Sequence, residues 1–173
     1  MPDRFRAALA CRIVALDRVQ FNDAVASGNY PCAPSTLKGS ARIFTEGQLL
    51  PLFFFARLSE FGIPARRAGF LACEMASVAS ADYAEPADRI VFVQCTSGNF
   101  FVPSKIKVPA TGDVEPNYNP EHETTLTKKY PQGMYYPATG RVIFTIEFYI
   151  RHVREIIAAR VADEVSILGE EEE

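Results

Sequence analysis

Residues 45–62 carry the signal that most limits how this chain can fold. Thr45 and Gln48 fit the Ser/Thr-x-x-Glu/Gln capping box, in which each side chain bonds the other residue's free backbone amide at a helix start. A wide apolar face follows and ends at Gly62; its members are Leu49, Leu52, Phe53, Ala56 and residues 58–61. Apolar residues make up 48% of the chain and charged residues 23%, as in a globular protein that buries a core.

A helix-turn-helix is predicted before this helix. Phe5, Leu9 and Ile13 recur at helical spacing and predict a short helix over about 3–11. Asp17 can cap a second helix that runs to Gly28, with only a tight turn between the two. Such a pair can place its second helix in the major groove of DNA.

The segments on either side of residues 45–62 are also interpretable. Residues 29–40, NYPCAPSTLKGS, are rich in residues that break helices and predict a loop or a small hairpin. Pro64 suits the first turn of a further helix, because its missing amide proton would be unpaired there. We expect that helix to end by Ala79.

The run 41–75, ARIFTEGQLLPLFFFARLSEFGIPARRAGFLACEM, resembles the winged-helix DNA-binding domain of the MerR family. Arg42, Phe44 and Thr45 fit the family's Arg-x-Tyr/Phe-Thr/Ser element, and residues 61–64 fit its Glu/Phe-Gly-Phe/Ile-x turn. The resemblance covers roughly residues 4–75. It implies that the helix from Asp17 is a recognition helix, that residues 29–43 form the wing, and that the protein regulates transcription.

Charge supports the same interpretation. Nine basic and five acidic residues precede residue 71, an excess of plus 4, so the remainder carries minus 7 of the net charge of minus 3. Arg18, Gln20 and Asn22 are residue types that reach base edges. Lys38 and Arg42 are expected to contact phosphates of double-stranded DNA. A solvated helix whose polar residues only maintain solubility is the alternative at each position.

The second half predicts a small antiparallel sheet and a long helix. Residues 89–95 and 100–108 read as a hairpin joined by residues 96–99. Pro103 within the second run indicates an edge position or a bulge. Residues 109–133 are expected to form a long exposed loop, and residues 141–145 a third strand. Apolar residues then recur at helical spacing and predict a helix to about Glu164; they are Ile146, Ile150, Val153, Ile157 and Val161.

The expected fold class is therefore α+β, with an N-terminal winged helix-turn-helix domain over residues 1–80. A small domain with an antiparallel sheet and a long C-terminal helix follows over 84–168, and residues 169–173 form an acidic tail. We expect this second domain to form a homodimer, since two-fold symmetry is the commonest arrangement.

The cysteines and the apolar pattern bear on location. Cys11, Cys32, Cys73 and Cys95 lie far apart without a CxxC pair, so we expect buried free thiols and a reducing, cytoplasmic compartment. No apolar run approaches the roughly 18 residues of a membrane-spanning helix, and the arginines near the start disfavour a signal peptide.

No sequence motif indicates an enzyme, a cofactor or a metal site. The chain has no glycine-rich phosphate loop and no supported nucleophile and base pair. His122, between two glutamates, is expected to be merely exposed. Two other functions stay open: a protein-interaction adaptor on a winged-helix scaffold, and a regulator that senses a small molecule. The residues that could line such a ligand site are Phe92, Phe100, Phe101, Phe144 and Phe148, for which core packing is the competing role.

Overall fold

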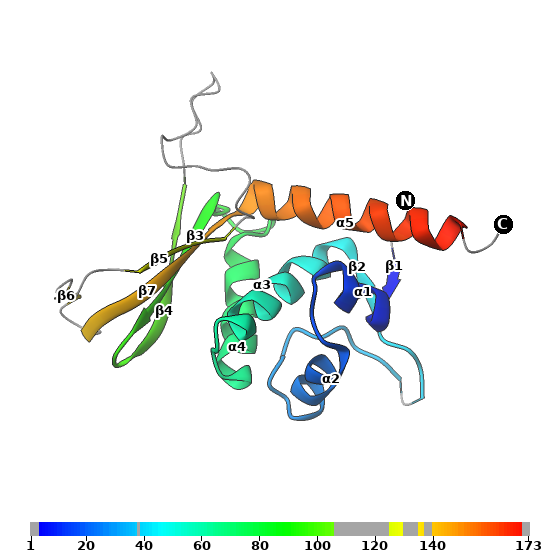
Figure 1. Cartoon of the computed structure of the whole chain (residues 1–173), viewed down its shortest axis with the longest axis horizontal. Helices are drawn as coiled ribbons and strands as arrows, with labels where there is room; N and C mark the ends of the chain where they lie inside the picture. The colour runs from blue at the N-terminus through cyan, green and yellow to red at the C-terminus, as the bar shows by residue number, and fades with distance from the viewer. Residues whose placement is uncertain (1–3, 38, 106–124, 130–134, 137–139, 171–173) are drawn as a thin grey trace, which may run out of the picture. The chain divides into compact units, whose positions relative to one another are not determined.

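The computed structural model describes residues 4–37, 39–105, 125–129, 135–136 and 140–170 (Figure 1). The chain forms two compact units, each taken by itself below. The first comprises Met1–Ser77 with Arg154–Glu173, and the second comprises Val78–Val153. The later turns of the long C-terminal helix thus group with the start of the chain.

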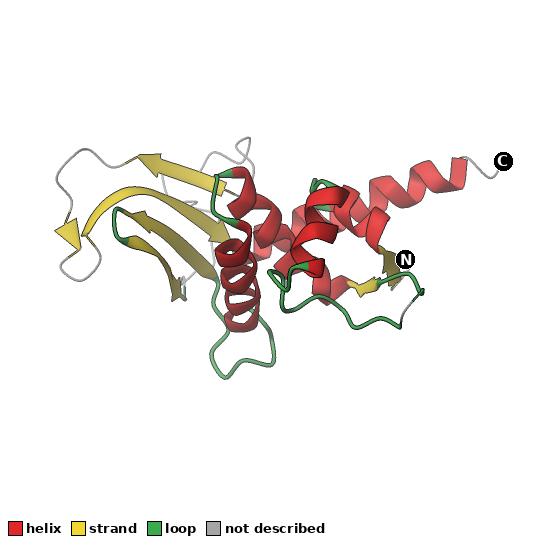
Figure 2. Cartoon of the chain, turned by 90° about the horizontal axis from the view of Figure 1, so that it is seen from below, coloured by secondary structure: helices red, strands yellow, loops and turns green. Residues whose placement is uncertain are grey.

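The first unit is mainly helical. Its elements are β1 (Arg4–Arg6), α1 (Ala7–Ile13), α2 (Arg18–Ala26), β2 (Ile43–Thr45), a short 3-10 helix (Glu46–Gln48), α3 (Leu49–Glu60), α4 (Ala65–Val78) and the later turns of α5 (Ile150–Glu170). Two short helices joined by a turn, a helix after the capping box and a helix after Pro64 are all present. Figure 2 shows the helices in red.

Helix α3 forms the core of this unit. Nine of its 12 residues are buried, and Phe53, Phe54 and Phe55 are fully so. The ring of Phe55 packs against Tyr30, which in turn contacts Phe21 of α2. Aromatic and aliphatic contacts with other elements therefore cover α3 on nearly every side.

The local signals that define the helix ends are present as predicted. The Thr45 amide donates to Gln48 Oε1 at 2.9 Å, which completes the capping box. Gly28 and Gly62 have φ angles of 67° and 79°, so both end a helix in the left-handed conformation that glycine adopts most readily.

The start of the chain differs from the prediction. Arg4–Arg6 form a strand rather than the first turn of a helix, and Phe5 pairs with Phe44 of β2. The two phenylalanines are both buried. Pairing with a strand nearly forty residues away outweighs the local helical spacing, because it covers both rings and satisfies backbone groups of both strands.

The connection between α2 and β2 is a loop, which is one of the two predicted forms. No strand occurs in the described part of residues 29–42. The base of the loop lies against α4: an added Cβ at Gly69 would be 1.8 Å from the backbone oxygen of Asn29. A disulfide between Cys32 and Cys73 joins the same two segments.

That disulfide shows that the prediction of four free thiols is wrong. Cys11 and Cys95 are free and buried, as expected, but Cys32 and Cys73 are bonded across a sequence separation of 41 residues. Spacing along the chain could not reveal the pair, because the fold brings the loop onto α4 through the close approach at Gly69.

The second unit contains the sheet. Its strands are β3 (Arg89–Cys95), β4 (Gly98–Ser104), β5 (Thr125–Lys129), β6 (Tyr135–Tyr136) and β7 (Gly140–Tyr149). The strands lie in the order β4-β3-β7-β5, with all pairs antiparallel, and β6 pairs with β7. The hairpin of β3 and β4 is confirmed, and Pro103 lies on the edge strand as predicted.

Three details of this half were predicted wrongly. The hairpin turn is shorter, since Cys95 already pairs with Gly98. Residues 125–129 form a strand inside the segment assigned to a loop. Residues 146–149 belong to β7 rather than to the following helix, which begins at Ile150. Pairing on both sides, with β3 and with β5, keeps these residues extended.

The fold is thus α+β, and the long C-terminal helix is present. Among the described residues, no helix is both long and apolar enough to cross a membrane.

The close approach at Gly69 gives a first test. Gly69→Ala should lower the free energy of unfolding by about 3 kcal/mol, because backbone atoms on both sides must shift to admit the new methyl group. Gly47→Ala is the matched control, since nothing lies within 4 Å of its added Cβ, and it should change stability by less than about 1 kcal/mol. Urea unfolding measures both. Equal stabilities would contradict the packing described here.

Candidate functional site

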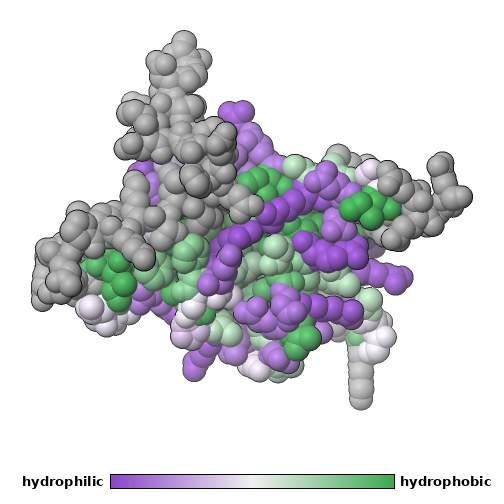
Figure 3. All heavy atoms as spheres, in the orientation of Figure 1, coloured by the Kyte–Doolittle hydropathy of each residue, from purple (hydrophilic) through white to green (hydrophobic). Residues whose placement is uncertain are grey.

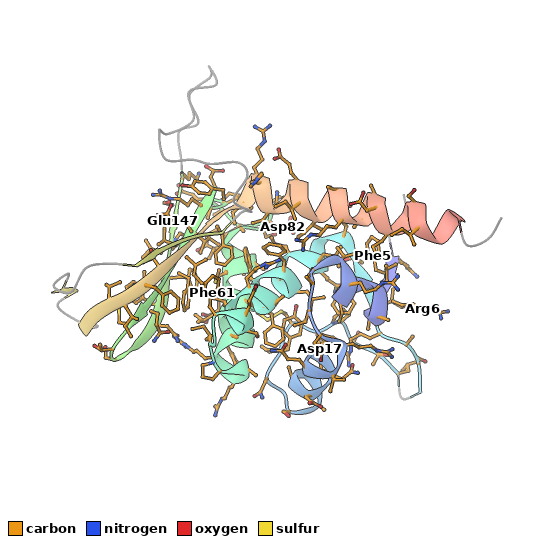
Figure 4. The ribbon with its side chains drawn as sticks, in the orientation of Figure 1. Phe5, Arg6, Asp17, Phe61, Asp82 and Glu147 are labelled. Carbon is orange, nitrogen blue, oxygen red and sulfur yellow. A yellow bond between two sulfur atoms is a disulfide. The ribbon has the colours of Figure 1, made fainter. Side chains whose placement is uncertain are left out.

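Helix α2 is the element that the sequence assigns to DNA. Asp17 caps it as predicted: its Oδ1 accepts a hydrogen bond from the Gln20 amide at 2.9 Å. One turn separates α1 from α2, and the amide of Leu16 donates to the oxygen of Cys11 at 2.9 Å within that turn. Asp17 lies at the start of α2 in Figure 4. The helix therefore has a fixed start and a defined orientation on α1.

The three predicted base-reading residues are all exposed on α2. Phe21 and Ala24 face the core, whereas Arg18, Gln20 and Asn22 face solvent. Arg18 and Asn22 are one turn apart and share one side of the helix, while Gln20 lies across from them. In Figure 3, which has the orientation of Figure 1, hydrophilic residues lie over the position of α2.

Two further residues of α2 were missed by the sequence reasoning. Val19 is 66% exposed and lies between Arg18 and Gln20 at the middle of the exposed surface. Asp23 is also exposed, one turn after Val19. An apolar side chain can contact a thymine methyl group, and a carboxylate can accept from a cytosine amino group. The sequence did contain a signal for Val19, because it is an apolar residue on the polar side of a predicted helix.

Of the two residues assigned to phosphates, Arg42 and Lys38, the structure describes only Arg42. Arg42 is partly buried, and its guanidinium donates a hydrogen bond to the backbone oxygen of Pro34. It therefore closes the loop between α2 and β2. Lys38 lies outside the described residues.

Several other basic residues of the first unit make internal contacts. Arg12 pairs with Glu164 of α5 at 2.8 Å. Arg57 pairs with Glu60 at 2.7 Å and lies over the ring of Phe53. Arg6 is exposed instead: Figure 4 shows it directed away from the unit, while its neighbour Phe5 points inward. The basic excess of the sequence is thus only partly available to a ligand.

The loop after α2 is held at its base and exposed beyond it. Tyr30 and Pro34 are buried, whereas the described residues from Ser35 to Ala41 are exposed, and Leu37 is 81% so. The Ser40 amide donates to the oxygen of Leu37 at 3.0 Å, which forms a turn in this exposed part. The loop can therefore contact a ligand with side chains that its base does not use.

Comparison with known protein-family models finds no match to this chain, and comparison with curated proteins finds none either. The assignment of α2 and its loop to DNA therefore depends on the geometry described above and on the resemblance in the sequence.

In the second unit, the proposed ligand-lining phenylalanines are divided between the two faces of the sheet. Strand alternation places Phe92, Phe101, Phe144 and Phe148 on one face and Phe100 on the other. Phe92 and Phe148 are fully buried, and Phe92 packs against Phe144. Four of the five therefore share an apolar face, of which at least two rings are core.

The other face of the sheet holds a polar network. The Tyr149 hydroxyl donates to Glu147 Oε2 at 3.0 Å, and Arg89 Nη1 lies 3.9 Å from the same oxygen. Arg89 Nε also donates to Ser104 Oγ at 3.2 Å. Desolvation, with Glu147 as the second cause, raises the pKa of Tyr149. This arrangement satisfies a buried carboxylate within the sheet, and we assign it a structural role. Across the described residues, no group of histidine, cysteine and acidic side chains could hold a metal ion, and His122 lies outside them.

The cap of α2 gives the second test. Asp17→Ala should cost about 1 kcal/mol of stability, because the Gln20 amide loses its acceptor. Asp17→Asn keeps an acceptor and should cost much less. Asp23→Ala removes the same charge from the exposed middle of α2 and serves as the control. Chemical unfolding compares the three variants. If Asp17→Ala were as stable as Asp23→Ala, the cap would not hold the helix start.

Proposed function

We propose that the protein is a sequence-specific DNA-binding transcription regulator that inserts α2 into the major groove. One observation carries the proposal: a capped helix, second in a helix-turn-helix, exposes Arg18, Gln20 and Asn22 while Phe21 and Ala24 fix it in the core. Such side chains can form paired hydrogen bonds with guanine or adenine edges. The MerR-like winged-helix architecture belongs to this proposal, with the loop between α2 and β2 in the position of the wing.

Phosphate contacts are part of the same proposal. Lys38 stays assigned to a phosphate by its position in the sequence, and the exposed Arg6 joins it. Arg42 contributes mainly by closing the loop, since its guanidinium bonds Pro34. These cationic contacts set the position of the protein on DNA and make binding depend on salt.

Two further features complete the proposal. DNA as the ligand implies action in the cytoplasm. A homodimer would place two copies of α2 on half-sites about 34 Å apart, one turn of the duplex, and give a palindromic operator. The protected region on a bound fragment, together with the mass of the protein in solution, tests the dimer.

The proposal is tested by titrating the purified protein with genomic DNA fragments at two salt concentrations. We expect particular fragments to be retained, with affinity falling as salt rises. Arg18→Ala should weaken specific binding by about 1–3 kcal/mol, and Asn22→Ala by a similar amount, because each removes contacts to a base edge.

Arg66→Ala is the matched control, because Arg66 is an exposed arginine of α4 and the change in charge is the same. It should reduce affinity far less than Arg18→Ala and leave the choice of fragment unchanged. Equal losses for the two variants would show that α2 does not read bases. No retained fragment at either salt concentration would end the proposal.

A further inference from the structure

We propose that Cys32 and Cys73 form a dithiol–disulfide exchange site that fastens the loop after α2, and with it the C-terminal end of α2, to helix α4. The bond joins a half-buried cysteine of the loop to a half-buried cysteine of α4. As a means of regulating DNA binding, the inference rests on the proposed function. As a site of redox modification, it stands on the geometry of the first unit alone.

The position of the bond determines what it controls. Cys32 lies a few residues after the end of α2, and the intervening Asn29 is in close approach to Gly69, one turn before Cys73 on α4. The Asn29 amide donates to the oxygen of Ala24 in α2 at 2.7 Å. A movement of Cys32 away from α4 would therefore act on both the end of α2 and the start of the exposed loop.

The docked segment also contains a group that opposes docking. The Tyr30 hydroxyl is buried, and the described residues offer it no hydrogen-bond partner. Burial of a polar group without a partner is unfavourable, because in water the group would be hydrogen-bonded. Burial of the ring and the disulfide both offset this cost. Breaking the disulfide removes one of the two, so the reduced segment should open more often.

The local geometry indicates how exchange proceeds. The Cys32 amide donates to Sγ of Cys73 at 3.3 Å, an arrangement that stabilises negative charge on that sulfur. A thiolate of a dithiol reductant therefore attacks Sγ of Cys32, the protein S–S bond breaks, and Cys73 leaves as the thiolate. The second thiolate of the reductant then closes its own disulfide and releases Cys32. Two electrons pass from the reductant, and both cysteines take up protons from water. An oxidised dithiol reverses the sequence.

The remaining cysteines do not compete in this exchange. Cys11 and Cys95 are both buried within the described structure. Burial also raises the pKa of Cys11 to about 11, so its reactive thiolate form is scarce at neutral pH. Exchange should thus be confined to the one pair.

The first test modifies thiols in the intact, folded protein. After treatment with dithiothreitol at neutral pH, iodoacetamide should add two groups, on Cys32 and Cys73, and none before reduction. Amide hydrogen exchange of residues 29–37 and of the last turn of α2 should then accelerate at least tenfold in the reduced protein. Unchanged exchange rates would overturn the proposal whatever the protein binds.

The second test measures the effect on DNA. We expect reduction to weaken binding to the retained fragments at least tenfold, because α2 and its loop lose a fixed position. The double variant Cys32→Ser/Cys73→Ser should bind DNA as weakly as the reduced protein, and dithiothreitol should not change its affinity. Cys95→Ser should respond to dithiothreitol like the wild type.

Tyr30→Phe removes the buried hydroxyl that opposes docking of the segment. It should shrink the difference in hydrogen-exchange rate between the two redox states. If Tyr30→Phe showed as large a difference in exchange rate between the redox states as the wild type, the buried hydroxyl would have no part in opening the segment.

The outcomes separate the two proposals. If reduction accelerates exchange and neither form retains DNA, the redox site stands and the DNA-binding function falls. If both forms bind the same fragments equally while exchange accelerates, DNA binding stands and its redox regulation is wrong.

Discussion

The burial of α3 is the constraint on which the first unit depends. A helix with nine buried residues out of 12 needs cover on several sides, and here Tyr30, at the base of the loop, provides part of it through Phe55, with Phe21 of α2 packed against Tyr30 in turn. Burying one such side chain fully is worth about 1.5–3 kcal/mol. Phe21 therefore links α2 to the cover of α3 through Tyr30, and to β2 through Phe44. The exposed side of α2 is whatever remains after Phe21 and Ala24 have been buried.

The base of the loop after α2 is fixed to α4 at two neighbouring points. At Gly69 two backbones approach closely enough to exclude any side chain, and the disulfide closes a 41-residue separation beside it. On a chain-entropy model, a closed loop of this length stabilises the fold by about 4 kcal/mol. Arg42 then holds the far side of the loop through Pro34. The described residues between these two anchors, 35–37 and 39–41, are exposed.

The sequence predicted the features that depend on neighbouring residues. The Asp17 cap, the capping box at Thr45 and the turns at Gly28 and Gly62 each act within one helical turn, so a local pattern was sufficient. Residues 146–149 were wrongly placed in a helix, because apolar residues there fit helical spacing as well as a strand covered on both faces. Pairing with β3 and β5 makes these residues a strand, and a short stretch of sequence does not show such pairing. The same holds for β1 with β2 and for Cys32 with Cys73.

The candidate site shows the same division between local and distant information. The sequence identified Arg18, Gln20 and Asn22 because they are residue types that reach base edges and because Asp17 marks the start of their helix. It could not show that Arg42 would be drawn to Pro34 or Arg12 to Glu164, since each partner is positioned by the fold. Counting basic residues therefore overstated the positive charge that a ligand meets. Under the proposed function, a surface with few available cations would gain less affinity from phosphates and depend more on base contacts, as in a protein that selects its site rather than one that coats DNA.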